Sequence, residues 1–114
     1  MSEIFAQGDL LIERVADVPV SGLPLACAAD GAVVLAEGEL SGHRHVFHDR
    51  VTMFRDDRLA RGIPAGLYVG HVKVEDASAR LVHDEHAPIS LPRGTWRVRR
   101  QRELEPKDAR IVAD

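Results

Sequence analysis

The chain has 114 residues, 45% of them hydrophobic, which suits a single domain (residues 1–114) that buries about two-thirds of its unfolded surface. Its 15 Lys and Arg residues against 18 Asp and Glu residues give a formal net charge of -3, which excludes a protein drawn to nucleic acid or an anionic membrane by its overall charge. The single cysteine, Cys27, excludes an internal disulfide. With no signal-peptide pattern and no apolar run of about 20 residues, we expect a cytoplasmic protein.

Apolar segments of strand length recur at intervals of roughly 8 to 12 residues, with turn residues between them. In chain order, the predicted strands are residues 9–15, 32–36, 43–48, 51–54, 67–74, 80–82, 89–91 and 95–102. Gly and Pro cluster at 62–66, the longest predicted loop, and at 92–94, a predicted turn. This spacing predicts an all-β fold, a small β-barrel or sandwich. A short helical segment is expected only at the C-terminal end, because Pro106 suits a first turn and Ile111 and Val112 offer an apolar face.

Five of the six histidines fall in two short clusters, residues 43–49 (HRHVFHD) and 83–86 (HDEH). Imidazoles beside carboxylates are the side chains that bind zinc, iron, nickel or copper. In a strand, His43 and His45 project from the same face roughly 6.5 to 7 Å apart, whereas His48 has the opposite parity. The first cluster therefore offers two ligands to one ion.

The second cluster is predicted to lie on a tight loop. His83 and His86 are three residues apart just before Pro88, which disfavours a helix there, and binding residues are often found on loops. We expect at least one of the two to reach an ion held by His43 and His45. The predicted metal ligands are His43, His45, His83, His86 and Asp49. The alternative is that these histidines are structural or solvent-exposed, in which case no metal binds.

The segment from His43 to Asp49 resembles the first cupin motif, in which two metal-binding histidines at HxH precede an acidic ligand by three or four residues. Residues 63–66 (IPAG) followed by His71 resemble the second motif, in which Pro-x-Gly precedes a further histidine. The resemblance covers residues 43–71 and departs from the family at Asp49, where glutamate is usual, and at His71, which lies two residues late. It implies a small β-barrel with a divalent metal in its mouth, and it leaves the role of His71 open.

Residues 93–102 (RGTWRVRRQR) contain five arginines. Strand alternation places Trp96 and Val98 on one face and Arg97 and Arg99 on the other. One interpretation is an edge strand protected from aggregation by its charge. The other is a surface that contacts an anionic partner, whether RNA, a protein or a small carboxylate. The negative net charge favours the first.

The sequence therefore predicts a small metal-binding β protein with a His/carboxylate site. Two classes of function stay open, a metal-dependent enzyme acting on a small molecule and a noncatalytic module that contacts an anionic partner through residues 93–102. Nucleic acid is not an expected partner. Because a short sheet with little helix leaves edges or faces uncovered, we also expect a homodimer.

Overall fold

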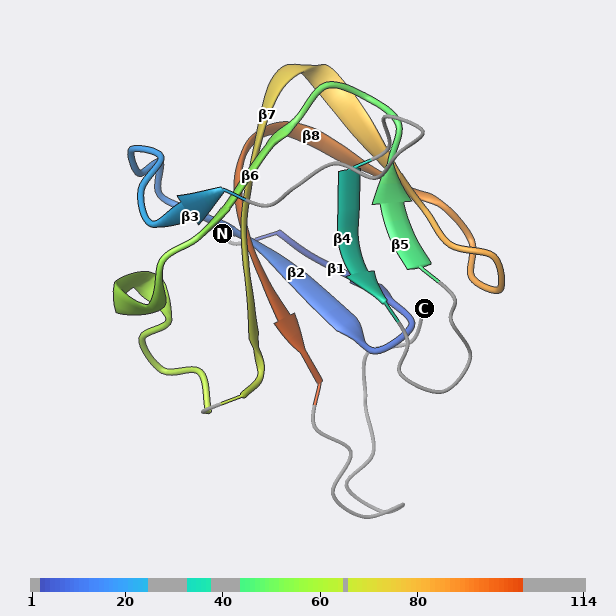
Figure 1. The fold of residues 1–114 in the computed structure, drawn as a ribbon. Helices are drawn as coiled ribbons and strands as arrows, with labels where there is room; N and C mark the ends of the chain where they lie inside the picture. Colours follow the sequence, from blue (N-terminus) through green and yellow to red (C-terminus); the bar gives the residue numbers. More distant parts are fainter. Residues whose placement is uncertain (1–2, 25–32, 38–43, 65, 102–114) are drawn as a thin grey trace.

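The strands form one antiparallel sheet with two long strands in its middle (Figure 1). The computed structural model describes residues 3–24, 33–37, 44–64 and 66–101, with the backbone alone for 33–37. In order across the sheet, the strands are β1 (Ile4–Gln7), β2 (Leu10–Val15), β8 (Ile89–Arg100), β7 (Tyr68–Val82), β5 (Arg44–Phe47) and β4 (Val33–Glu37). Off this path, β6 (Thr52–Arg55) pairs with β7 and with the two-residue β3 (Leu23–Pro24), and the 3-10 turn η1 (Asp57–Leu59) follows β6.

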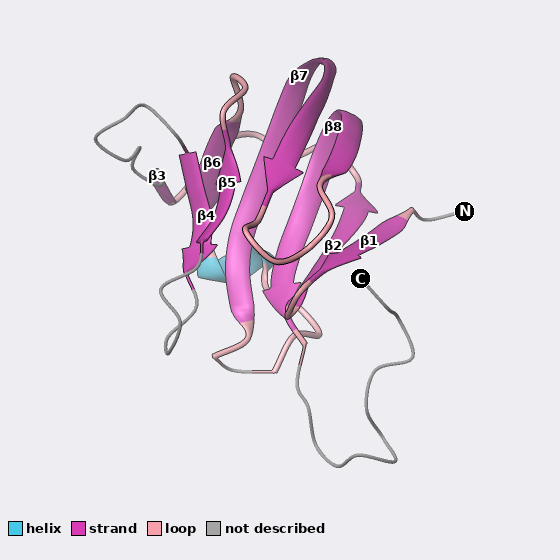
Figure 2. Cartoon of the chain, turned by 90° about the vertical axis from the view of Figure 1, so that its right-hand side faces the viewer, coloured by secondary structure: helices cyan, strands magenta, loops and turns pink. Residues whose placement is uncertain are grey.

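The long hairpin of β7 and β8 bends in its middle. Its ladder is irregular between Val74 and Ser78, and opposite Val74 stands Gly94, whose φ of +149° is one that side chains rarely adopt. Before the bend, residues 71–73 of β7 pair with β6, and after it, residues 81–82 pair with β5. The two halves of β7 therefore have different neighbours on the same edge. Figure 2 shows β4, β5 and β6 on one side of the hairpin and β1 and β2 on the other.

Side chains from both halves of the hairpin meet in one core. The register pairs Ile12 of β2 with Val98 of β8, and Trp96 of β8 with Val72 of β7, so these apolar side chains share the inner face. Phe5 of β1 packs on Trp96 with ring centroids 5.5 Å apart. The buried core residues are Leu10, Ile12, Phe47, Met53, Val72, Val74, Ala79, Leu81, Leu91, Trp96 and Val98.

The predicted all-β fold is confirmed, but the closed barrel is not formed. Closure would require every strand to hydrogen-bond along both edges. Within the described residues, the strand order ends at β1 on one side and β4 on the other, and no ladder joins them. The sheet is therefore open and folds over itself at the bent hairpin.

The predicted breaks within the long hairpin are wrong. Residues 68–74 of one predicted strand and residues 80–82 of the next belong to a single strand, β7, and residues 89–91 join 95–100 in β8. Residues 92–94 are the bend inside β8 and not a turn, because β8 stays paired with β7 on either side of them, with a shift in register at the bend. The edge-strand interpretation of the Arg-rich segment is also wrong, since β8 lies between β2 and β7.

Strand β1, the C-terminal segment and the search for membrane-spanning helices complete the comparison with the sequence. No prediction from the sequence includes β1, which pairs with β2 through a tight hairpin. The expected helical segment at the C-terminal end lies outside the described residues, as does Cys27. In the described part of the chain, no helix has the length and apolar character needed to cross a bilayer.

Candidate functional site

Three of the predicted ligands lie together, His45 on β5 and His83 and His86 on the loop after β7. The ring centroids of His45 and His83 are 4.4 Å apart, and those of His83 and His86 are 4.7 Å apart. His45 is buried, and the other two are half-buried. The clusters meet because Val46 pairs with Val82 in an antiparallel ladder, so the residue before Val46 lies beside the residue after Val82.

Gln7, at the end of β1, is fully buried and orients the imidazole of His45. Its amide nitrogen donates to the backbone oxygens of Leu81 at 3.0 Å and Ala87 at 2.9 Å. Its side-chain oxygen therefore faces Nδ1 of His45, at 2.9 Å. Because an amide oxygen only accepts, Nδ1 carries the proton. In the neutral ring, Nε2 then holds the lone pair that a metal ion binds.

Asp9 places a carboxylate beside this lone pair. One of its oxygens lies 3.6 Å from Nε2 of His45, and the other is ion-paired with Arg100. The pKa of the Asp9 carboxyl is lowered to about 2, first by the hydrogen bond that the doubly protonated form of the His45 ring donates from Nε2 and then by Arg100, so the carboxyl is ionised at neutral pH.

Gly8 allows the β1–β2 turn to approach the histidines. Its φ of +59° is left-handed, and a Cβ there would lie 3.0 Å from Nε2 of His86 and 3.2 Å from Cε1 of His45. Both rings therefore border the same small space against Gly8. Glycine suits this position for two reasons: it accepts the left-handed backbone conformation, and it leaves room for the imidazoles.

The other candidate residues that the structure describes do not join this cluster. His43 lies outside the described residues, and His48 is exposed. Asp49 accepts a hydrogen bond from the backbone nitrogen of Arg80 at 2.6 Å, so it holds the turn after β5 against β7. His71 lines a separate cavity.

Sequence reasoning missed Gln7, Gly8 and Asp9. The Gly8-Asp9 pair between two apolar segments is a recognisable turn signal, and it could have predicted the β1–β2 hairpin. The histidines that this hairpin meets depend on the bend of β7 and β8, which no local signal reveals.

The cluster, as it stands, is not a complete metal site. Among the described residues, no three His, Cys, Asp or Glu side chains already have a geometry that could hold a metal ion. His83 shows one reason, since its Nδ1 accepts a hydrogen bond from the backbone nitrogen of Glu85 at 3.0 Å. His83 could bind an ion shared with His45 only after its ring turns.

The fold and the cluster together define a small, open-sheet β protein with a buried, oriented histidine at one end. Residues 6–101 match the model of a family described as a domain of unknown function, DUF8820. This match spans most of the chain, so the protein belongs to that family. No curated protein and no solved structure matches the chain.

Proposed function

We propose that the protein binds one divalent transition metal ion, such as zinc, iron or nickel, through His45, His86 and Asp9. His83 becomes a further ligand when its ring turns. The observation that carries the proposal is the hydrogen bond from His45 to Gln7, because it leaves the Nε2 lone pair of a buried imidazole beside an ionised carboxylate. Imidazole nitrogen with carboxylate oxygen is a ligand set that such ions accept.

The supporting residues suit this role. Gln7 fixes the tautomer of His45 in the way that hydrogen-bond partners behind metal ligands commonly do. Arg100 holds Asp9 in place, and Gly8 leaves the space open. When bound, a divalent ion supplies Lewis-acid chemistry at any coordination position that the protein leaves open.

The resemblance of residues 43–49 to the first cupin motif favours the same chemistry. The proposal keeps His45 from that motif. It replaces Asp49 by Asp9, because Asp49 is engaged with the backbone of Arg80 while Asp9 lies next to His45.

The proposal is tested by titrating chelator-treated protein with zinc in a calorimeter and with cobalt in a visible spectrometer. We expect uptake of about one ion per chain. His45→Ala should abolish uptake, and His86→Ala and Asp9→Asn should each weaken it by about tenfold or more. His48→Ala is the matched control, because His48 is exposed and outside the cluster, and it should bind as the wild type does.

Two results would contradict the proposal. One is a wild-type protein that takes up none of zinc, cobalt, nickel and iron. The other is a folded His45→Ala variant that still binds with wild-type affinity. Circular dichroism of each variant separates loss of a ligand from loss of the fold.

A further inference from the structure

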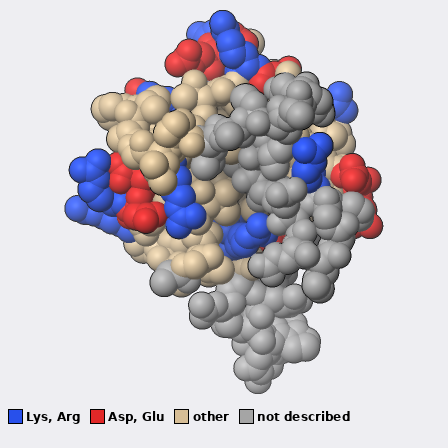
Figure 3. Space-filling view, viewed as in Figure 1, with Lys and Arg blue, Asp and Glu red and all other residues tan. Residues whose placement is uncertain are grey.

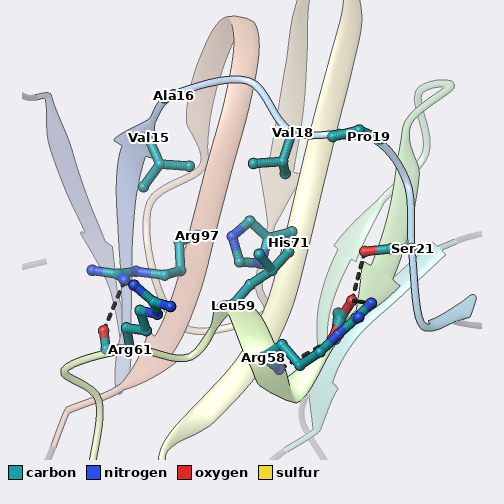
Figure 4. A pocket seen from close by; sticks show the side chains of 11 residues that line it. Val15, Ala16, Val18, Pro19, Ser21, Arg58, Leu59, Arg61, His71 and Arg97 are labelled. Atoms are coloured by element: carbon teal, nitrogen blue, oxygen red, sulfur yellow. Dashed lines mark hydrogen bonds and ion pairs between the residues drawn. The ribbon is translucent and has the colours of Figure 1, made fainter.

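A cavity of about 690 Å³ lies on the opposite face of the sheet from the core. None of the histidine-cluster residues lines it. Figure 4 shows the segment from Val15 to Ser21 arching over one side, Leu59 of η1 on the other, and His71 and Arg97 between them. Its size is within the range of roughly 300 to 1,000 Å³ that small-molecule sites have.

A row of polar side chains crosses the strands at this cavity. The register sets Glu13 of β2, Arg97 of β8 and His71 of β7 side by side. Arg97 donates through Nε to Glu13 at 2.7 Å and through Nη1 to the backbone oxygen of Arg61 at 3.1 Å. The guanidinium is therefore fixed in position before any ligand arrives.

His71 is the group that points to a ligand. It is 3% exposed, and its Nδ1 lies 2.7 Å from the hydroxyl of Tyr68, whose oxygen also accepts from the backbone nitrogen of Asp56. The hydroxyl proton is thus directed at Nδ1, which leaves Nε2 as the N–H of the neutral ring. Nε2 has no hydrogen-bond partner in the described residues, and Figure 4 shows a ring nitrogen facing the Arg97 side of the cavity. A buried donor without a partner is costly, and a ligand acceptor would satisfy it.

Among the described residues around the cavity, one arginine is not paired with a carboxylate, which suits the binding of a single anion. Three guanidinium groups line it, and two are neutralised, Arg97 by Glu13 and Arg58 by Asp56. Arg61, at the exposed rim, has no ion-pair partner among the residues that the structure describes. Figure 3 likewise shows basic and acidic side chains intermixed over η1, without a broad field of one sign. Such a surface suits a small monoanion better than a polyanion.

The rest of the lining is mostly apolar. Val15, Val18, Pro19 and Leu59 form walls that would cover a hydrocarbon body. We propose that this cavity binds a small monocarboxylate with an apolar or aromatic body, whose carboxylate accepts from Nε2 of His71 and pairs with Arg61. The site is independent of the metal proposal, because it shares no residue with the histidine cluster.

The test uses three probes that separate the effect of the charge from that of the apolar body. These are 3-phenylpropionate, its uncharged amide 3-phenylpropanamide, and acetate, which has the charge without the body. Binding to the full chain is followed by amide chemical shifts in NMR titrations. We expect 3-phenylpropionate to shift resonances of residues 15–21 and 57–61. The amide should bind about tenfold or more weakly because it lacks the charge that strengthens the hydrogen bond, and acetate because it lacks the apolar body.

Variants locate the site. His71→Phe keeps a ring stacked on Phe54 and removes the donor, and we expect it to weaken 3-phenylpropionate binding about tenfold. Arg61→Ala should weaken it several-fold. Arg50→Ala is the control, because this exposed arginine is paired with Asp76 outside the cavity, and it should change nothing.

Three results would overturn the inference. The first is equal binding of the acid and the amide, which would show that the charge is not recognised. The second is a folded His71→Phe variant with wild-type affinity. The third is that neither 3-phenylpropionate nor branched aliphatic and aromatic monocarboxylates bind at about 10 mM. A specific site would have a dissociation constant below this concentration.

Discussion

The side chains of Gln7 and His45 hydrogen-bond to each other although their strands do not pair in the sheet. Strands β2, β8 and β7 separate β1 from β5 in the strand order. The contact forms because the outer half of the bent hairpin folds over the β1–β2 turn, where Gln7 also holds the backbone oxygens of Leu81 and Ala87. One buried amide therefore joins three segments that are distant in the sequence.

Replacing Gln7 by leucine should affect both stability and metal binding. The variant keeps a similar volume and leaves Nδ1 of His45 and two backbone oxygens without their partner, so we expect the free energy of unfolding to fall by about 2–4 kcal/mol. Zinc affinity should fall by about 10- to 100-fold, because the tautomer of His45 is no longer held. Urea unfolding and calorimetry measure the two effects. Gln101→Leu is the control, since that side chain makes no hydrogen bond within the described part of the chain, and an equal loss in both variants would contradict the role of Gln7.

Gly8→Ala should weaken zinc binding in addition to lowering the free energy of unfolding. The new Cβ would lie at 3.0 Å from His86 and 3.2 Å from His45, so the rings must move apart. Gly66→Ala is the matched control, because Gly66 has a φ of +83° and a Cβ added there would meet nothing within 4 Å. Both variants should lose about 1–2 kcal/mol of stability from the left-handed backbone, and only Gly8→Ala should lose zinc affinity. Unchanged zinc affinity in Gly8→Ala would show that the two rings do not share an ion.

The stability of the protein should depend on pH through His71. Burial lowers the pKa of His71, and the nearby Arg97 lowers it further. The folded protein then binds a proton less readily than the unfolded chain, whose histidines titrate near pH 6.5. The stability that depends on a neutral His71 is present in full above about pH 6.5. It is lost as the pH falls from there toward the lower pKa that His71 has in the folded protein. Urea unfolding at several pH values should give a steeper loss for the wild type than for His71→Phe, and parallel profiles would refute this linkage.

Gly22 should be less tolerant of alanine than Gly62. Both have a left-handed backbone, with φ of +72° and +78°, so both substitutions carry a similar backbone cost of about 1–2 kcal/mol. A Cβ at Gly22 would in addition collide with the backbone oxygen of Arg55, whereas one at Gly62 meets nothing within 4 Å. Gly22→Ala should therefore disrupt the pairing of β3 with β6 and lower the melting temperature further. Equal melting temperatures for the two variants would contradict the contact.

Local patterns were sufficient for much of the sheet. The apolar run at residues 9–15 became β2, and alternation placed Trp96 and Val98 on one face of a strand, where the structure buries both. These predictions succeed because the alternation of apolar residues that marks a strand and its buried face is visible within a few consecutive residues. The breaks predicted inside β7 and β8 failed because the turn residues Pro92 and Gly94 serve here as a bend within a strand.

By itself, the sequence determined that the protein is all-β and that His83 and His86 lie on a loop before Pro88. Only the tertiary structure decided which groups stand beside His45. The pairing of Val46 with Val82 brings in the second histidine cluster, and the folded-over hairpin brings in Gln7 and Asp9. Such contacts depend on which distant strands bury their apolar faces together, and this is a property of the whole core that no single segment encodes.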